Sequence, residues 1–436
     1  MYIKQIILKN IRGFSEVNFD LSRRDGRYAG WTVFTGDNGS GKSTLLKGIA
    51  VGLVGKDASR ALQPSFNRWV RDGAGAEEAS IQLEIVRCKD DDALVETGRA
   101  PAAEFPAKIV LRNGGKETTI QAAVPAGKAH QKYSTPERTI WSLDAKGWFS
   151  CGYGPFRRVF GASPEATRQM VAPTTERFVT MFQEAASLAE VDQWLRLLKH
   201  KDLESKDKDS PEREQLALVL GLLRDDLMPN QITVDRVDSD GLWLKDRNGV
   251  QLAWGEMSDG YRAAAALLAD IVRHLIGTYG LENLTEKTSE GKTAIKRSGV
   301  VLIDEIDAHL HPEWQRVIGF WLKRHFPNIQ FLVTTHSPII CQAADPNGLF
   351  VLPEPGSDTK PRSLTDEEYT KVIASRPDTI LLTPAFGLQN TRSPRAVEAR
   401  AELAKLDAKK RSGATLTPAE EGQVQTLMPF VNPDEE

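Results

Sequence analysis

A glycine-rich octapeptide is the segment whose residue types and spacing point most directly to chemistry. Residues Gly36-Asp37-Asn38-Gly39-Ser40-Gly41-Lys42-Ser43 fit the pattern G-x-x-x-x-G-K-[ST]. The backbone N–H groups of such a loop, with the positive end of a following helix dipole, bind a polyphosphate. Lys42 would then reach the β- and γ-phosphates, and the Ser43 hydroxyl would ligate Mg²⁺. A glycine-rich turn can match the same pattern, so the surrounding elements decide between the two interpretations.

The flanking residues predict a strand before this loop and a helix after it. Residues 31–35 are β-branched and aromatic, which is typical of a buried strand. Residues 44–50 are rich in leucine and other helix-forming residues. A strand, a loop and a helix in this order are the setting that the phosphate-binding interpretation requires.

A second segment places two carboxylates at the end of an apolar strand. Residues 300–303 form an apolar run that ends in Asp304 and Glu305. A strand buried on both faces needs such a run, and its carboxyl end is where an α/β sheet presents ligands. Asp304 would hold the Mg²⁺ shell, and Glu305 would polarise an attacking water. An ordinary strand that meets a polar loop is the alternative, and Lys42 upstream disfavours it.

Two further segments have the right positions for phosphate contacts. His336 follows the predicted strand at 328–335 and lies 31 residues after Glu305. A lone histidine is usually structural, but this spacing favours a sensor of the γ-phosphate. Residues Ser258-Asp259-Gly260-Tyr261 precede an alanine- and leucine-rich helix predicted over 261–276, and Ser-x-Gly at a helix start is a backbone anion site.

In this order the four segments resemble the ABC-type ATPase family, over about residues 1–352. Residues 258–261 correspond to the family signature, which is more usually Ser-Gly-Gly-Gln. The departures at Asp259 and Tyr261 are similar to those of the branch that contains RecF-like, SMC-like and OLD-like ATPases, including the AAA_21 and AAA_15 families. Residues 10–14 (Asn-Ile-Arg-Gly-Phe) and 304–312 also resemble that branch.

This resemblance implies an α/β fold: an ABC-type P-loop ATPase head with a mixed sheet core and an antiparallel β-subdomain, a short helical insert and a C-terminal helical tail. It implies ATP and Mg²⁺ as the bound groups. The implied catalytic residues are Lys42, Glu305 and His336, and the implied Mg²⁺ ligands are Ser43 and Asp304. The implied nucleotide-binding residues are Gly36, Asp37, Asn38, Gly39, Ser40, Gly41, Lys42, Ser43, Thr44 and Arg12.

The resemblance also implies two heads that face each other head to tail around ATP. Ser258, Asp259, Gly260 and Tyr261 of one copy would then approach the phosphate bound by Lys42 of the other, and Asp307 would lie in the loop that couples the two sites. The glutamine-loop position stays open between Gln183 and the loop 153–157. His309 and His311 before Pro312 fit either helix entry or, less well, a metal site.

Composition limits the class of protein. The 436 residues include 40% apolar residues, enough for a packed core, and carry a net charge of −3, which argues against a uniformly basic DNA-coating protein. We find no apolar run near 18 residues and no signal-peptide pattern, so we expect no membrane association. The three scattered cysteines (Cys88, Cys151, Cys341) fit a reducing, cytoplasmic location.

Changes of pattern predict four parts: an ATPase lobe at 1–160, a helical insert at 161–228, a second lobe at 229–355, and a helical tail at 356–436. Strand-like pieces at 79–87, 106–121 and 139–143 predict the antiparallel sheet. One helix face is predicted from Phe178, Met181, Phe182, Ala185 and Leu188, and a second helix from Ser210-Pro211.

Two segments have open interpretations. Residues 108–158 hold nine Lys/Arg against three acids, a net of +6, which fits a DNA or RNA contact or a solvated sheet edge equally well. In the tail, Val397, Ala401, Ala404 and Ala408 mark one predicted helix face, and Thr417-Pro418-Ala419-Glu420 predicts a capping box at the start of a second helix. Such a hairpin fits either the docking of a partner or a frayed extension.

The spacing of the motifs separates relatives. Lys42 and Ser258 are 216 residues apart, which disfavours a transport ATPase, and the short insert excludes a long coiled-coil arm. About 100 residues follow His336, without the pattern of a nuclease domain. We therefore expect an ATPase that regulates a separately encoded effector, such as a nuclease, and that resembles the ATPase components of the anti-phage systems Septu and PARIS. The alternatives are a RecF-like DNA-binding ATPase in repair and a nucleotide-locked scaffold with little turnover.

Overall fold

The computed structural model describes residues 1–73, 77–93, 102–123, 135–157, 173–184, 186, 188, 190–207, 209–229, 231–357 and 359–430. The chain divides into two compact units, residues 1–375 and 376–436. Each is described by itself below. The finer division into four parts stays a prediction.

The first unit is built around a six-stranded sheet of order β16-β15-β3-β14-β13-β7. Its strands are β3 (Gly30–Thr35), β7 (Ser150–Tyr153), β13 (Gly299–Ile303), β14 (Ile329–Thr334), β15 (Leu349–Val351) and β16 (Arg362–Ser363). All neighbours pair in parallel except β16, which runs antiparallel to β15. Every residue of β13 and β14 is buried, as parallel strands covered on both faces require. The carboxyl ends of the parallel strands therefore meet at one edge of this central sheet.

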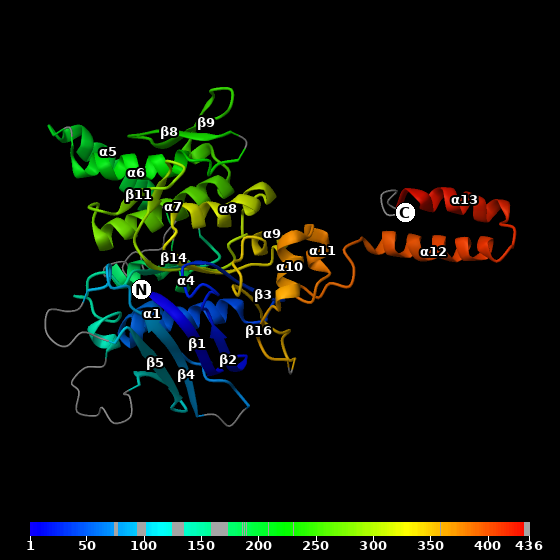
Figure 1. The fold of residues 1–436 in the computed structure, drawn as a ribbon, viewed down its shortest axis with the longest axis horizontal. Coiled ribbons are helices and arrows are strands. Elements are labelled where there is room, and N and C mark those ends of the chain that lie inside the picture. The colour runs from blue at the N-terminus through cyan, green and yellow to red at the C-terminus, as the bar shows by residue number, and fades with distance from the viewer. Residues whose placement is uncertain are drawn as a thin grey trace. The chain divides into compact units, whose positions relative to one another are not determined.

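A five-stranded antiparallel sheet of order β2-β1-β4-β5-β6 forms the second layer. Its strands are β1 (Tyr2–Ile11), β2 (Phe14–Asp20), β4 (Glu78–Val86), β5 (Glu104–Asn113) and β6 (Thr118–Ala122). Helix α1 (Lys42–Leu62) contacts strands of both sheets (Figure 1). Its apolar side chains share one core with both layers, including Leu46, Ile49, Leu83 and Leu332. Burial of this helix between two apolar faces is the main hydrophobic contribution to the unit.

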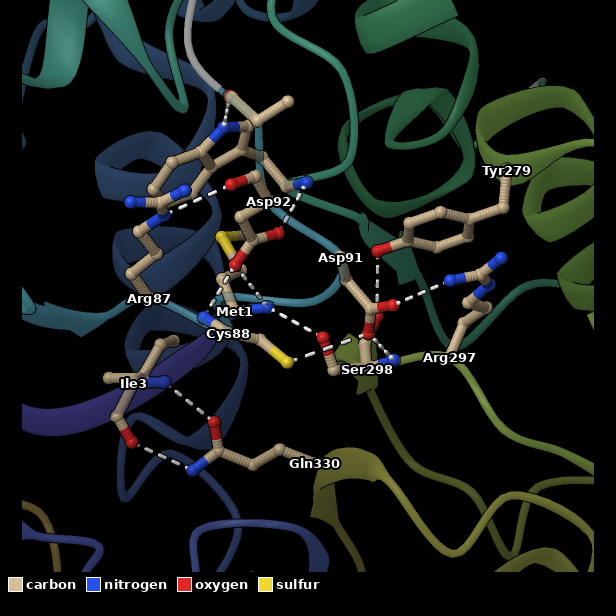
Figure 2. Close-up of polar contacts among 12 residues, drawn as sticks. Met1, Ile3, Arg87, Cys88, Asp91, Asp92, Tyr279, Arg297, Ser298 and Gln330 are labelled. Atoms are coloured by element: carbon tan, nitrogen blue, oxygen red, sulfur yellow. Dashed lines mark hydrogen bonds and ion pairs between the residues drawn. The ribbon is translucent and has the colours of Figure 1, made fainter. Parts of the chain in front are cut away.

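Polar side chains join the two sheets at the edge opposite to the phosphate loop (Figure 2). The Gln330 amide, at the start of β14, donates to the Ile3 carbonyl at 2.8 Å and accepts from the Ile3 N–H at 2.7 Å. The Met1 amino group lies 2.8 Å from the Asp92 carboxylate and donates to Ser298 Oγ at 2.9 Å, just before β13. Strand β1 is thereby anchored to two strands of the central sheet.

The remaining elements of the first unit pack around α1 and the two sheets. They are α3 (Pro173–Glu176), α4 (Val179–Phe182), α5 (Glu190–Glu204), α6 (Pro211–Arg224), β8 (Thr233–Asp238), β9 (Gly241–Lys245), β10 (Gln251–Ala253), α7 (Asp259–Tyr279), β11 (Thr285–Lys287), β12 (Thr293–Ile295), α8 (Pro312–His325), α9 (Pro338–Cys341) and α10 (Asp366–Ala374), with single 3₁₀ turns η1 (Pro136–Arg138) and η2 (Trp254–Glu256). Figure 1 shows α7 and α8 on the side of β14 away from α1. A mixed core sheet, an antiparallel subdomain and a helical insert are thus present, and the predicted ABC-type α/β fold is confirmed.

Two local predictions in this unit are wrong. Residues 178–188 do not form one helix, because α4 is a single turn that ends at Phe182 and Gln183 takes an extended conformation. Ala185 of that predicted face lies outside the described residues. Residues 139–143 are not a strand; they follow η1 as turns, and the Trp141 indole N–H donates to the Gly52 carbonyl at 2.9 Å. By contrast, α6 begins as predicted, with the Ser210 side chain as its cap.

The second unit contains α11 (Pro377–Leu381), α12 (Pro394–Arg411), α13 (Pro418–Leu427) and η3 (Met428–Phe430). The capping box of Thr417 and Glu420 is present as predicted. Helix α12 carries the predicted face, with Val397, Ala401, Ala404 and Ala408 exposed, while Ala399 and Leu403 are buried. None of the helices in the described parts of the chain is long and apolar enough to cross a membrane.

Candidate active site

The phosphate loop Gly36–Ser43 connects the carboxyl end of β3 to the first turn of α1. Gly41 has a φ of 94°, and a Cβ atom there would lie 2.5 Å from the ring of Phe14. Gly36 has a φ of 147°, and its Cβ would lie 2.7 Å from the Leu352 carbonyl. Glycine is therefore required at both positions, because the backbone is left-handed and closely packed from below. The loop thus leads directly into the N-terminus of α1, where an anion site is expected.

Lys42 closes this loop in the structure. Its ammonium group donates to the carbonyls of Gly36 at 2.8 Å and Asp37 at 2.9 Å. Burial lowers the pKa of Lys42, while the nearby carboxylates of Glu305 and Asp304 act in the opposite direction. The lysine of the loop thus lies within electrostatic range of both carboxylates at the end of β13.

Asp304 is the residue most suited to hold a cation. Its side chain is 1% exposed, and its Oδ1 accepts a 2.5 Å hydrogen bond from the Thr334 hydroxyl at the end of β14. Its Oδ2 is buried and has no hydrogen-bond partner among the residues that the structure describes. An unpartnered buried carboxylate oxygen is costly, and a divalent cation shared with the Ser43 hydroxyl would satisfy it. The donor set of carboxylate and hydroxyl oxygens fits Mg²⁺.

Glu305 occupies a tight turn directly after this ligand. Its φ is 47°, in the left-handed region, and its N–H donates to the Thr334 hydroxyl at 2.7 Å. The following Ile306 N–H donates to the Thr334 carbonyl at 3.0 Å. Thr334 therefore contacts both carboxylate residues of the site. It was missed from the sequence because a threonine at a strand end carries no distinctive pattern.

His336 is held between two anchored neighbours after β14. The Thr335 hydroxyl donates to Asp307 Oδ1 at 2.5 Å, and the Ser337 hydroxyl donates to Gln315 Oε1 at 2.6 Å. His336 itself is exposed. The segment therefore presents an imidazole at the same edge as the phosphate loop, and it is tied to Asp307, the residue predicted for the coupling loop.

The predicted signature segment makes its contacts elsewhere. Ser258 is exposed and precedes α7, and a Cβ on Gly260 would lie 2.5 Å from the His309 carbonyl. The ring of Tyr261 packs against Trp314 of α8, with centroids 4.8 Å apart. This segment is therefore joined, within one chain, to the loop that follows Asp307 rather than to the phosphate loop.

Two basic side chains border the site. Arg12 lies in the turn between β1 and β2 with a φ of 46°, and its guanidinium stacks over Trp69 at 4.8 Å. Lys47, one turn after Ser43 on α1, was not predicted. Burial lowers its pKa, with Asp304 acting in the opposite direction and Arg12 in the same direction. The spacing of four residues from Ser43 was the signal that would have found it.

The glutamine-loop prediction for Gln183 does not fit this geometry. Its side-chain amide donates to the Leu62 carbonyl at 2.9 Å, at the opposite end of α1 from Lys42. The competing loop, residues 153–157, lies at the site, because Arg157 donates to the carbonyls of Asp304 and Glu305. Burial lowers the pKa of Arg157 to about 10.

The structure limits the interpretations of the basic segment at residues 108–158 and of the pair His309 and His311. Within residues 108–158, Arg157 is buried and Arg112 pairs with Glu78 at 2.9 Å, while Lys128, Lys132 and Arg158 lie outside the described residues. His311 caps α8 by accepting from the Glu313 N–H at 3.3 Å, which is the helix-entry role. In the described part of the chain, no three His, Cys, Asp or Glu side chains form a metal cluster.

Two family models match the first unit in sequence. The AAA_23 model, "AAA domain", matches residues 5–217, and the AAA_21 model, "AAA domain, putative AbiEii toxin, Type IV TA system", matches residues 169–342. The two matches together run through the phosphate loop, the signature segment, the carboxylate pair and His336. Both are models of AAA domains, and AAA_21 is one of the families that the four segments were found to resemble.

The curated relatives include a Septu protein and probable ATPases of retrons. The "Retron Ec83 probable ATPase" of Escherichia coli is 41% identical over 109 residues, covering 25% of this chain and 18% of the relative. The "Septu protein PtuA" of Bacillus mycoides (strain KBAB4) is 24% identical over 343 residues, covering 78% of this chain and 38% of the relative. The "Retron Vc95 probable ATPase" of Vibrio cholerae serotype O1 biovar El Tor is 25% identical over 378 residues, covering 78% of this chain and 71% of the relative. The chain thus spans well under half the length of the first two.

One of the solved structures that align with this chain is the Smc head domain with an extended coiled coil bound to the C-terminal domain of ScpA, derived from Pyrococcus furiosus. The alignment covers 85% of this chain and 98% of the Smc head chain. The TM-score is 0.49 and the identity is 17%.

Proposed function

We infer that this chain, which has an ABC-type ATPase head and is related in sequence to the Septu and retron ATPases, binds and hydrolyses ATP between two copies of itself. The observation that carries the proposal is the buried Asp304 Oδ2, which has no partner in the described part of the chain and shares an edge of the sheet with the Lys42 loop. A structural carboxylate would be paired. An oxygen left free beside a polyphosphate cradle supports a Mg²⁺-nucleotide ligand.

The roles of the residues follow from their positions. The Lys42 ammonium group exchanges its loop carbonyls for the β- and γ-phosphate oxygens of ATP. Ser43 and Asp304 would hold Mg²⁺, which would neutralise the charge that develops on the phosphates. Glu305 accepts a proton from the attacking water, and His336 donates a hydrogen bond to the γ-phosphate.

The exposed position of Ser258 supports completion of the site by a second copy. Its backbone lies at the N-terminus of the 21-residue helix α7, where N–H groups and the helix dipole attract a phosphate. Asp259 is also exposed, with 77% of its side chain accessible. In a head-to-tail dimer these groups would contact the ATP held by the partner's loop, so that ATP would join the two heads.

For the biological role, we propose regulation of a separately encoded effector, such as a nuclease, in a cytoplasmic anti-phage system. The Septu and retron relatives support this role. The second unit, with its two-helix hairpin, is the proposed docking part. Salt-sensitive, ATP-dependent DNA binding would instead favour the repair alternative. Stable ATP-bound dimers without turnover would favour the scaffold alternative.

The first test compares wild type with Glu305→Gln. We expect turnover to fall by about 10²–10⁴-fold, while ATP produces a stable dimer in light scattering. Equal turnover of the two proteins would refute Glu305 as the base. Absence of ATP binding in the wild type would refute the proposal as a whole.

The second test mixes Lys42→Ala with Ser258→Arg. Each variant alone has no complete site in a head-to-tail dimer. A mixed dimer has one complete site, and half of the dimers are mixed, so we expect about a quarter of wild-type turnover to return. If the mixture stays as inactive as its components, Ser258 does not act across the interface.

A further inference from the structure

Arg157 is a buried arginine whose guanidinium group donates, within the described part of the chain, to backbone carbonyls. Arg157 follows β7 in the sequence, and it is 5% exposed. Nη1 donates to the carbonyls of Gly154 at 3.1 Å and Asp304 at 2.7 Å, and Nη2 donates to those of Glu305 at 2.9 Å and Ile306 at 3.4 Å. Three consecutive carbonyls of the turn after β13 thus converge on one planar fork. A lysine could not reproduce this pattern.

The turn that Arg157 holds is the one that aims the Glu305 carboxylate. Glu305 has a left-handed φ of 47°, a conformation that non-glycine residues adopt at a cost. The conformation persists only if its neighbours fix it. The Glu305 N–H is bound by Thr334 and its carbonyl by Arg157, so both adjoining peptides are held. Because the backbone at Glu305 sets the direction of its Cβ, these bonds set where the carboxylate points.

The loop that carries Arg157 is itself firmly placed. The Tyr153 carbonyl accepts from the Asp304 N–H at 2.8 Å, and the Tyr153 hydroxyl donates to the buried Asp270 carboxylate of α7 at 3.0 Å. Gly154 packs so closely that a Cβ there would lie 2.3 Å from the Thr180 carbonyl. Arg157 therefore acts from a fixed platform.

We propose that Arg157 is a positioning residue for hydrolysis: it holds the Glu305 turn so that the carboxylate meets the attacking water. The proposal rests on the assignment of Glu305 as the base. The guanidinium group of Arg157 contacts the backbone carbonyls of Asp304 and Glu305. It acts through the backbone, so its loss should slow the chemical step while ATP binding by Lys42, Ser43 and Asp304 persists.

Arg157→Lys is the informative variant, because it keeps the positive charge and removes the fork. A displacement of the base by about 1 Å costs about 10²-fold in rate, so we expect kcat to fall by 10- to 100-fold. The Kd for Mg²⁺-ATP should stay within about twofold, because uniform binding is not affected.

Arg23→Lys is the matched control. Arg23 is 8% exposed and also buried beside the central sheet, but its guanidinium contacts Thr32, in the first half of β3, at 2.7 Å. Both variants lose a buried guanidinium group, which in Arg23 donates through Nη2 to Thr32, and only Arg157→Lys loses contact with the Glu305 turn. Arg23→Lys should lower the melting temperature and leave kcat within twofold.

Hydrogen exchange supplies a measurement that needs no turnover. In the Arg157→Lys variant the amides of residues 305–307 should exchange about tenfold faster than in the wild type, because local opening becomes easier. In Arg23→Lys the same peptide should keep the wild-type rate. Both results together with the kcat loss support the proposal.

The failures are distinguishable. A kcat within twofold of wild type in Arg157→Lys, or an equal kcat loss in Arg23→Lys, would overturn the positioning role. Unchanged exchange at 305–307 would overturn it as well. If instead the wild type turns over no faster than Glu305→Gln, the proposed function is wrong, and the exchange result still decides whether Arg157 holds the turn.

Discussion

Replacing Thr334 by valine removes one hydroxyl that serves both carboxylate residues of the site. The hydroxyl donates to Asp304 Oδ1 at 2.5 Å and accepts from the Glu305 N–H at 2.7 Å. Valine has nearly the same shape, so the change is almost purely one of hydrogen bonding. Asp304 then keeps a buried carboxylate without this bond, and the Glu305 N–H loses its acceptor.

The expected loss of stability follows from these two bonds. A hydrogen bond to a charged group contributes about 1.5–3 kcal/mol, and leaving a buried N–H unpaired costs about 1–3 kcal/mol. We therefore expect the free energy of unfolding to fall by about 3–5 kcal/mol. With an unfolding entropy of about 2.1 cal/mol/K per residue, this corresponds to a drop of about 5 °C in Tm for a unit of this size.

The expected loss of function is larger than the loss of stability alone implies. Partners that orient a metal ligand change metal affinity or activity by about 10- to 100-fold when they are removed. Phosphate release measured over a Mg²⁺ titration should therefore show a higher half-saturating Mg²⁺ concentration and a lower plateau, at a temperature where the variant is folded.

Thr32→Val is the control for this experiment. Thr32 is fully buried on β3, and its hydroxyl accepts from the Arg23 guanidinium at 2.7 Å. Its loss should lower Tm similarly without changing the Mg²⁺ dependence. If Thr334→Val lowers Tm but keeps both kcat and the Mg²⁺ half-saturation within twofold, then Asp304 does not depend on Thr334, and the reasoning fails.

Three further predictions test other parts of the chain. Gly41→Ala, whose Cβ would meet an aromatic ring at 2.5 Å, should abolish ATP binding in a fluorescent-nucleotide titration while the fold survives by circular dichroism. Gly260→Ala should displace the His309 carbonyl, because the signature segment packs against the loop that carries His309. We therefore expect turnover to fall at least tenfold while ATP affinity is retained. Normal turnover would show that this contact does not matter for hydrolysis. The bond from Lys409, followed by bonds from Thr417, lowers the pKa of Glu420 to about 2, so its stabilisation of the α12–α13 hairpin is present above the ordinary value of about 4.5 and is lost as pH falls towards 2. Exchange protection of α13 should fall over that range in the wild type and be weak at all pH values in Glu420→Gln.

The arrangement of the main motifs could be predicted because strand topology determines where these motifs lie. Lys42, Asp304 and His336 each follow an apolar strand, and parallel strands bring their carboxyl ends to one edge. The residue types at these ends are distinctive, so the sequence alone was sufficient to group them. The same logic identified the antiparallel subdomain from its alternating strands.

The supporting contacts could not be predicted, for physical reasons. Arg157 is 147 residues from Asp304 in sequence, and its bonds go to backbone carbonyls, which leave no trace in residue identity. The break after Phe182 also has no breaker residue, and at this break the Gln183 amide donates to the Leu62 carbonyl of α1, a tertiary contact that residue spacing does not encode. On α12, the predicted face is exposed, and helical spacing alone does not show that Ala399 and Leu403 are the buried side chains.

The left-handed backbone of Glu305 has a consequence for how this protein would evolve. Glycine or asparagine adopts that conformation more readily, so selection for thermostability alone would favour losing the carboxylate. A library of variants screened only for resistance to heat should therefore accumulate substitutions at position 305. A library screened for ATP turnover, the proposed activity, should retain glutamate there, despite its cost to the folded state.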